Sequence, residues 1–368
     1  MAERRPEPAE GLRPEPVEGR LGLIFGGQSL EHEVSVVSAQ HVKEAARDRF
    51  DVVPIGVTKT GAWLTPEETQ RQLDRDDEPY KKAMELAGAD GLLARPQALT
   101  ALREIDVAFP LIHGTFGEDG TLQGFLELAG VPYVGAGVAA SAIGMDKALM
   151  KRIFRQAGLD VVDYMVVRLS QYKTRARELG DAVETSIGYP AFVKPANGGS
   201  SVGITRVRSR EDLSAAFALA FSHDRKVLVE KAVEAREIEC AVLGNDDPEA
   251  SPLGEISYTR EFYDYEAKYL DPNTRLIIPA QLPYETERRI RELAVRGYRA
   301  IDCAGMGRMD FFLTEDGQVY IDEVNTLPGF TPGSMYPRLW QHAGLSYSDL
   351  IARLVELGLE RHKERTRG

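Results

Sequence analysis

The sequence has few cysteines. Only Cys240 and Cys303 are present, far apart and without a CxxC pattern, so neither a disulfide framework nor a zinc site is predicted. No apolar run reaches the ~20 residues that a membrane-spanning helix needs, and the N-terminus lacks the apolar core of a secretory signal. These absences argue against secreted and membrane-spanning classes and favour a cytoplasmic protein.

Positive charge is also scarce. Asp and Glu total 57 against 45 Lys and Arg, for a formal net charge of −12, which argues against general affinity for nucleic acid or anionic membranes. An anionic ligand would have to be held by locally placed cations. The 368 residues allow two or three domains, with enough apolar content for buried cores.

The N-terminal part is predicted to contain a tail and a Rossmann-like domain. Residues 1–20 carry the repeat RPEPAEG and RPEPVEG, which buries too little apolar surface to order itself and is predicted to be disordered. In residues 21–135, a strand from Leu21, the turn Gly26-Gly27 and a helix from Glu31 to Arg47 predict a Rossmann-like unit with a largely parallel sheet. Also expected there are strands Val52–Val57 and Ile105–Leu111, a helical insertion Glu67–Leu92 and a helix closing at Gly130.

Two further domains are predicted, so the fold class is α/β with α+β character. Residues 136–229 should form a small, strand-rich domain and residues 230–368 a third region. The second is expected to hold a helix from Lys147 to about Gly158 and strands Val161–Arg168, Ala191–Lys194, Val202–Val207 and Lys226–Glu230. The third is expected to hold strand Glu237–Leu243, a hairpin, and helices Glu285–Ile301 and Ser348–Arg361.

The hairpin carries the most informative residues. Two apolar runs flank Asp316-Gly317, the strongest short signal for a two-residue turn. That turn places Asp310 opposite Glu323, with Asn325 diagonal on the same face, and with Cβ atoms about 4.5 to 5.5 Å apart. A register slip of one residue would turn one carboxylate away.

Two carboxylates so close among apolar neighbours repel each other unless a cation lies between them. Three hard oxygen ligands suit Mg²⁺ or Mn²⁺, and Mg²⁺ commonly completes its octahedron with water and substrate phosphates. The hairpin therefore predicts a metal and nucleotide site. A surface hairpin with solvated acids is the alternative.

The segment KPANGGSSVGITRV begins at Lys194 and is rich in small residues, among them Gly198, Gly199, Ser200 and Ser201. Small residues let backbone N–H groups approach phosphate oxygens. The segment is neither a Walker loop nor a dinucleotide fingerprint. Between two predicted strands it is expected to be a flap over a nucleotide, and a loose surface turn is the alternative.

Other signals are weaker. Lys147 alone could be a solvated surface charge, and His113 could be a structural hydrogen-bonding residue. Glu33, in the first helical turn, could meet a ligand ammonium or simply cap the helix. The polar, aromatic stretch EFYDYEAKYLDPNTR from Glu261 is expected to be a loop that closes over a ligand.

Together, KPANGGSSVGI, EKAV, FYDYEAKY, GRMDFF and DEVNTLPGF resemble the ATP-grasp superfamily, and within it the D-alanine:D-alanine ligases. FGGQSLEHEVSVVSA and HGTFGEDGTLQG resemble the substrate domain of these ligases, which other ATP-grasp enzymes do not share. The resemblance runs from Leu21 to near the C-terminus. It implies an ATP-grasp fold behind an N-terminal Rossmann-like substrate domain, the substrates D-alanine and ATP, and a homodimer.

The resemblance also implies residue roles. Phosphates, adenine and ribose of ATP would be held by Lys147, Lys194, Gly198, Gly199, Ser201, Glu230, Lys231, Ala232, Val233, Glu237 and Phe262. Two Mg²⁺ or Mn²⁺ ions would be held by Asp310, Glu323 and Asn325. The two D-alanines and the reacting groups would be held by Glu33, Ser200, Lys268, Tyr269, Arg308, Gly329 and Ser334.

Within these implied roles, Glu33 binds the first D-alanine's ammonium and forms a hydrogen-bonded set with Ser200 and Tyr269. Lys268 faces the γ-phosphate, and Ser334 binds the second D-alanine's carboxylate. Three alternatives are less well supported. FYDYEAKY, with Tyr269 in place, resembles the dipeptide-forming ligases more than a D-alanine:D-lactate ligase, and FGGQSLEHEVSV argues against an ATP-grasp ligase for another carboxylate. A nucleotide-binding regulatory protein without turnover would lack a metal ligand or lysine, and none is missing from this sequence.

Overall fold

The computed structural model describes residues 19–75, 84, 91–92, 95–199, 201–257 and 275–366. The predictions for the N-terminal repeat, for Ser200 and for the closing loop with Phe262, Lys268 and Tyr269 lie outside these ranges.

The first domain is built on a three-stranded parallel sheet of order β2-β1-β3, as predicted. Its strands are β1 (Arg20–Gly26), β2 (Asp51–Val57) and β3 (Val107–Pro110). Its helices are α1 (His32–Ala46), α2 (Pro66–Leu73), the 3₁₀ helix η4 (Pro96–Arg103) and α3 (Thr121–Ala129), which ends at Gly130. Of the expected helical insertion, α2 forms the start, and most of the rest lies outside the described residues.

The second region is a four-stranded antiparallel sheet of order β4-β7-β5-β6, here called the central sheet. Its strands are β4 (Tyr164–Arg168), β5 (Ala191–Pro195), β6 (Thr205–Val207) and β7 (Lys226–Lys231). Against it pack α6 (Leu169–Ser186) and α7 (Leu213–His223), with η5 (Arg210–Asp212) at the start of α7. The helices α4 (Val138–Met145) and α5 (Lys147–Gln156) precede this sheet in the chain and contact strand Val319–Asn325 of the third region instead. The strand predicted from Val202 begins only at Thr205, because Gly203, with φ +76°, still belongs to the turn.

The third region is a five-stranded sheet of order β10-β9-β8-β11-β12, here called the C-terminal sheet. Its strands are β8 (Ala235–Leu243), β9 (Glu249–Ser257), β10 (Arg275–Ile277), β11 (Met306–Thr314) and β12 (Val319–Asn325). Helix α9 (Tyr284–Ala300) covers one face, and α10 (Met335–His342) follows β12. Alternate residues of β11 point to α9, so Met309 and Phe311 are buried there while Asp310 faces the other side.

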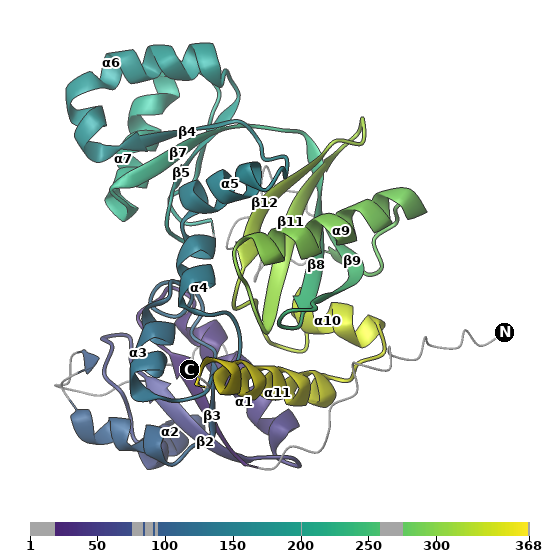
Figure 1. The fold of residues 1–368 in the computed structure, drawn as a ribbon. Coiled ribbons are helices and arrows are strands. Elements are labelled where there is room, and N and C mark those ends of the chain that lie inside the picture. Colours follow the sequence, from purple (N-terminus) through teal and green to yellow (C-terminus); the bar gives the residue numbers. More distant parts are fainter. Residues whose placement is uncertain are drawn as a thin grey trace.

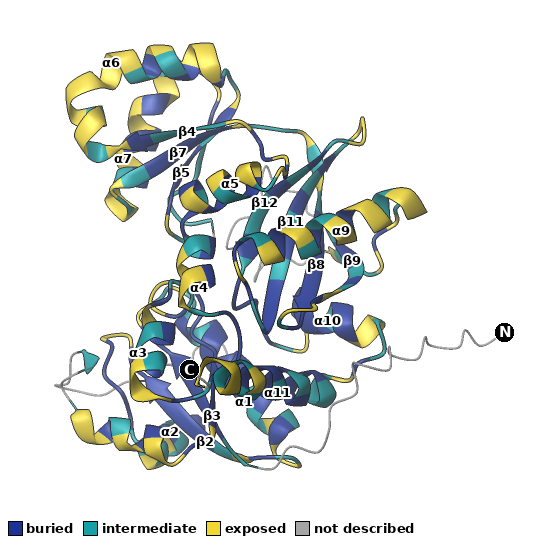
Figure 2. Ribbon diagram, viewed as in Figure 1, coloured by how far each residue is buried: buried dark blue, intermediate teal, exposed yellow. Residues whose placement is uncertain are grey.

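The last helix, α11 (Tyr347–Arg365), lies beside α1 of the first domain (Figure 1). Leu350 and Leu354 share one hydrophobic core with Leu21 and Val36. The domain boundaries at 135/136 and 229/230 remain predictions. Figure 2 shows buried residues in all three sheets, beside intermediate and exposed ones, and exposed residues on the outer faces of α6 and α9. No helix in the described part of the chain is both long and apolar enough to cross a membrane.

Candidate active site

Two adjoining cavities lie on the face of the C-terminal sheet that α9 leaves uncovered. The first, the nucleotide-side cavity, lies between the central and C-terminal sheets and is lined by Lys147, Lys194, Gly198, Gly199, Ser201, Glu230, Lys231, Val233, Glu237, Arg308, Asp310 and Glu323 among others. The second, the substrate-side cavity, reaches the first domain and is lined by Glu31, His113, Glu118, Glu239, Asn325, Gly329 and Ser334 among others. Lys147, Gly198, Gly199, Glu239, Arg308 and Glu323 line both.

The hairpin places its acidic side chains as predicted, by a route that the sequence did not indicate. Asp310 pairs with Glu323. The two-residue turn is wrong: Thr314 N donates to Gln318 O at 3.0 Å and Gly317 N donates to Thr314 O at 3.0 Å, which closes a three-residue loop. A bulge between Asp310 and Phe311, with Asp322 as the extra residue, then restores the register at the carboxylates.

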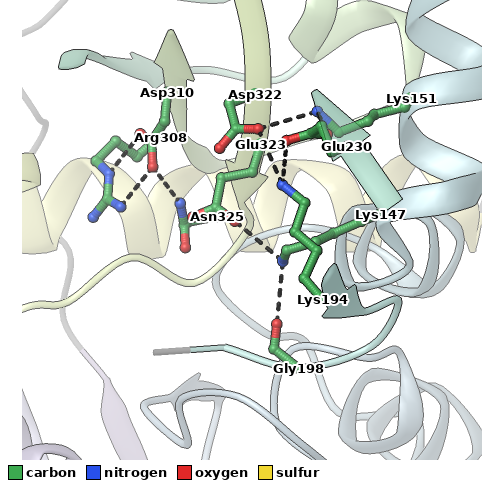
Figure 3. A network of polar contacts seen from close by, with 10 residues as sticks. All are labelled: Lys147, Lys151, Lys194, Gly198, Glu230, Arg308, Asp310, Asp322, Glu323 and Asn325. Carbon is green, nitrogen blue, oxygen red and sulfur yellow. Dashed lines mark hydrogen bonds and ion pairs between the residues drawn. The ribbon is translucent and has the colours of Figure 1, made fainter. Parts of the chain in front are cut away.

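Basic side chains accompany both hairpin carboxylates (Figure 3). Arg308 donates two hydrogen bonds of 2.8 Å to the two oxygens of Asp310, and Asn325 Nδ2 donates to Asp310 Oδ2 at 2.8 Å. Lys147 Nζ lies 3.1 Å from Glu323 Oε2. Each of the two carboxylates that the sequence places opposite each other is therefore paired with a basic side chain of its own.

Arg308 also lies 3.0 Å from Glu239, which pairs with Asp310 on the other neighbouring strand. Glu239, Asp310 and Glu323 thus form a row across β8, β11 and β12. Burial alone would lower the pKa of Arg308, but Asp310 and Glu239 hold this pKa well above its ordinary value. The guanidinium is a permanent cation between the two cavities.

The donor set of Asp310, Glu323 and Asn325 offers two carboxylates and one amide oxygen, which fits a hard divalent cation. Within the described ranges, no group of three His, Cys, Asp or Glu side chains is placed to hold a metal ion. A metal site here therefore depends on Asn325 together with phosphate or water oxygens.

The glycine-rich segment is tied to the start of α5. Lys147 N donates to Ala196 O at 2.8 Å and Lys147 Nζ donates to Gly198 O at 3.1 Å. The same Nζ contacts Glu323, so Lys147 links the segment to the hairpin. Lys194 is buried, and its Nζ lies 2.6 Å from Glu230 Oε1. Both lysines to which the resemblance assigns phosphate contacts thus line the nucleotide-side cavity.

The resemblance assigns adenine binding to the backbone of residues 230–233, and this segment fits that role only in part. Lys231 N donates to Asp163 O at 2.9 Å and Ala232 N donates to Pro190 O at 3.0 Å. Both amides are thus used within the protein, and Ala232 lines neither cavity. Lys231 and Val233 do line the nucleotide-side cavity, so the Val233 backbone is the better candidate for a purine edge.

Glu33 is not placed at the site. Its carboxylate pairs with Lys59 Nζ and lines neither cavity. Burial alone would raise the pKa of Glu33, but the Lys59 ammonium and a backbone N–H lower it. Glu31, two residues earlier, lines the substrate-side cavity. The helix begins at His32, one residue later than predicted, so Glu31 is the residue before it.

Glu31, Glu118 and His113 also line the substrate-side cavity. The sequence predicted no role for Glu31 or Glu118 and only a structural one for His113. Glu31 Oε2 lies 3.6 Å from where a Cβ on Gly199 would stand. Burial, together with the charge of Glu31, raises the pKa of Glu118 to about 8, although Gly114 N donates to its carboxylate at 2.8 Å. Burial lowers the pKa of His113, whose Nδ1 lies 3.1 Å from Leu327 O. His113 is thus the hydrogen-bonded, buried residue that the sequence suggested.

Ser334 and Gly329 lie together at the far end of the substrate-side cavity. Thr331 N donates to Ser334 Oγ at 3.1 Å, and a Cβ on Gly329 would stand 3.1 Å from the same oxygen. Both residues thus line the cavity. The roles that the resemblance implies, the second D-alanine's carboxylate for Ser334 and the tetrahedral centre for the Gly329 amide, stay predictions.

Two sheets closing on one cavity, with lysines from one side and a carboxylate row on the other, define the ATP-grasp class of enzymes. Two family models match the chain, D-ala D-ala ligase N-terminus over residues 20–136 and D-ala D-ala ligase C-terminus over residues 153–356. The chain belongs to the D-alanine–D-alanine ligase family.

Curated relatives agree. The D-alanine–D-alanine ligase of Geobacillus kaustophilus is 48% identical over 356 residues, covering 94% of this chain and 96% of that protein. D-alanine–D-alanine ligase A of Salmonella typhimurium is 47% identical over 354 residues, covering 93% and 96%.

Solved structures show the same fold. The D-alanine-D-alanine ligase of Coxiella burnetii matches with a TM-score of 0.77 and 32% identity, covering 95% of this chain and 96% of that one. VanG D-Ala:D-Ser ligase of Enterococcus faecalis matches with a TM-score of 0.77 and 35% identity, covering 93% and 100%.

Proposed function

We propose that this chain ligates two D-alanine molecules to D-alanyl-D-alanine, with ATP converted to ADP and phosphate, for the synthesis of cell wall precursors. The observation that carries the proposal is the position of Lys147. It contacts Glu323 and the glycine-rich segment where the two cavities adjoin. A phosphoryl group transferred from one cavity to a carboxylate in the other would pass this cation.

The nucleotide would occupy the cavity between the two sheets. Lys147 and Lys194 supply positive charge for the phosphates, Glu237 lines the cavity where a ribose would be held, and Val233 offers its backbone to adenine. Lysine ammonium groups neutralise phosphate oxygens as point charges.

Mg²⁺ or Mn²⁺ would be held by Asp310, Glu323 and Asn325. When bound, such ions neutralise phosphate charge and polarise the transferred phosphoryl group. The protein's own contribution is to hold Asp310 between Arg308 and Asn325, so that the oxygen donors are in place beforehand.

For the first D-alanine, Glu31 replaces Glu33 in our proposal as the residue that meets the ammonium, because only Glu31 lines the cavity. The carboxylate of this D-alanine attacks the γ-phosphorus, the bond to ADP breaks, and an acyl phosphate forms. A free carboxylate would not react with an amine, whereas the acyl phosphate has phosphate as its leaving group.

The amine of the second D-alanine then attacks the acyl carbon, loses a proton, and displaces phosphate. Arg308 and the Gly329 amide would stabilise the oxyanion, a contribution often worth ~3 kcal/mol per donor. Ser334 would hold the carboxylate of the second D-alanine.

We further propose that the chain acts in the cytoplasm, where ATP is available. We also propose that it forms a homodimer, which light scattering would test.

The experiment supplies ATP and Mg²⁺ with D-alanine alone, then with added D-lactate or D-serine, and follows phosphate release and the products. We expect D-alanyl-D-alanine to be the main product near neutral pH in all three mixtures. A depsipeptide or a D-alanyl-D-serine product in excess would overturn the substrate assignment. Absence of ATP-dependent product in all mixtures would overturn the activity itself.

A further inference from the structure

Four charged side chains at the nucleotide-side cavity are here called the charge quartet: Lys151, Lys194, Glu230 and Asp322 (Figure 3). The first three are buried, and Asp322 is partly exposed. Lys151 Nζ lies 2.8 Å from Glu230 Oε2 and 3.0 Å from Asp322 Oδ1. Lys194 Nζ lies 2.6 Å from Glu230 Oε1 and 3.6 Å from Asp322 Oδ1. Each lysine therefore contacts both carboxylates.

The quartet joins the two sheets that wall the cavity. Lys194 on β5 and Glu230 on β7 belong to the central sheet. Asp322 is the bulge residue of β12, and Lys151 lies on α5, whose Phe154 packs in the core beneath the C-terminal sheet. The pairs Lys151–Glu230 and Lys194–Asp322 thus cross from one half to the other.

Lys151 differs from the other three members in its exposure. Lys194, Glu230 and Asp322 line the cavity, whereas the Lys151 side chain has 0% exposure and does not. Lys151 is therefore not placed to contact a nucleotide. A fully buried lysine is costly unless it is paired, so its effect on the site must pass through the two carboxylates that it contacts.

The charges of the quartet balance, with two lysines against two carboxylates. Without Lys151, Lys194 would be left as the one quartet cation between the carboxylates of Glu230 and Asp322. The three remaining groups would then present a net negative charge to the phosphates. Without the Asp322 charge, the quartet would instead be positive.

We propose that Lys151 is a positioning residue of the nucleotide site, which keeps Lys194 able to meet the phosphates by sharing Glu230 and Asp322 with it. The inference rests on the proposed nucleotide role of Lys194. It also assigns a purpose to the bulge in β12, because the bulge is where Asp322 enters the quartet.

The test measures ADP affinity of the full chain by calorimetry in Mg²⁺ buffer for Lys151→Met, Asp322→Asn and the double variant. Met approximates the length of Lys without its charge, and Asn has the shape of Asp. Arg152→Met, which removes an exposed cation from the same helix, is the matched control. Thermal unfolding of each variant confirms that it is folded.

We expect affinity to follow the net charge of the quartet. Lys151→Met should weaken ADP binding at least about tenfold, Asp322→Asn should bind as tightly as the wild type or more tightly, and the double variant should return to within about threefold of it. Arg152→Met should change affinity less than about twofold.

A double variant that binds as weakly as Lys151→Met would overturn the proposal, because loss of packing alone is not repaired by a second substitution. If Lys151→Met does not fold, Asp322→Asn decides: binding at least as tight as the wild type supports the proposal, and weaker binding overturns it. A wild-type chain that binds no adenine nucleotide would instead refute the proposed function.

Discussion

The two cavities of the site differ in how their charges are arranged. On the nucleotide side, two lysines and two carboxylates are paired at 2.6 to 3.6 Å and balance each other. On the substrate side, Glu31 and Glu118 lie near each other, and the nearby Arg308 is already bound to Asp310 and Glu239. His113 there has a lowered pKa because it is buried.

The difference matches the ligands that each cavity would take. A polyanion needs cations that are held in place. In the charge quartet the two lysines share the two carboxylates, so the acids position Lys194 without outnumbering the cations. An amino acid carries its own ammonium group, so a cavity with more carboxyl groups than basic side chains suits it. A variant that changes the charge on one side should therefore change binding of the ligand on that side and leave binding of the other ligand unchanged.

The largest effect is expected at the hairpin, where the two sides meet. Glu323→Gln should reduce turnover by about a thousandfold or more, because an amide replaces the carboxylate that contacts Lys147 and is proposed to hold the metal ion. Steady-state ADP release measures this. Glu315→Gln, an exposed acid in the turn of the same hairpin, should leave turnover unchanged. Full activity of Glu323→Gln would refute the metal hypothesis.

The next largest effect is expected for the free energy of unfolding, through Glu118 at the substrate-side cavity. Glu118 has its pKa raised to about 8, so the folded state keeps a proton that the unfolded state has lost. Stability should therefore fall as pH rises from about 4.5 to about 8. Glu118→Gln should remove this slope and raise the free energy of unfolding by a few kcal/mol at pH 9, with little change at pH 4.

Urea unfolding at several pH values measures the Glu118 effect. A variant whose stability depends on pH as the wild type's does would show that another group causes the slope. The nucleotide side provides the contrast, since ADP affinity of Glu118→Gln should stay within about twofold of the wild type.

A smaller effect should separate two neighbouring acids. Glu31→Gln should raise the KM for the first D-alanine about tenfold or more, because a carboxylate facing the substrate-side cavity is lost. Glu33→Gln should change it less than about twofold, because Glu33 pairs with Lys59 on a partly exposed surface. Equal effects of the two substitutions would contradict the reassignment. The KM for ATP should be unchanged in both variants.

Sequence reasoning succeeded where local pattern decides the structure. The apolar runs of β11 and β12 predicted a hairpin, and the glycine turn Gly26-Gly27 after the first strand predicted the parallel sheet. It failed where one residue matters. The turn has three residues and a bulge compensates for it, so two errors cancelled at the carboxylates. The resemblance assigned the ammonium contact to Glu33, whereas Glu31, two residues earlier, is the one that lines the substrate-side cavity.

The quartet could not be predicted in this way. Lys151 and Asp322 are separated by 171 positions, and no periodicity connects a lysine on a helix with the extra residue of a bulge. The structure shows Lys151 fully buried on α5, which is unusual for a charged residue. Its partners, Glu230 and Asp322, lie on two different sheets and become neighbours only in the folded structure.

Helix α11 has a consequence for how the protein is made. Leu350 and Leu354 complete the core that contains Leu21 and Val36, and Ser348 Oγ donates to Ala45 O at 2.9 Å. On the ribosome, the first sheet is therefore translated long before the helix that covers it. The apolar surface of that sheet stays exposed until α11 has been translated. A truncated chain without α11 would keep this surface exposed, and chaperones or other unfolded chains could bind it.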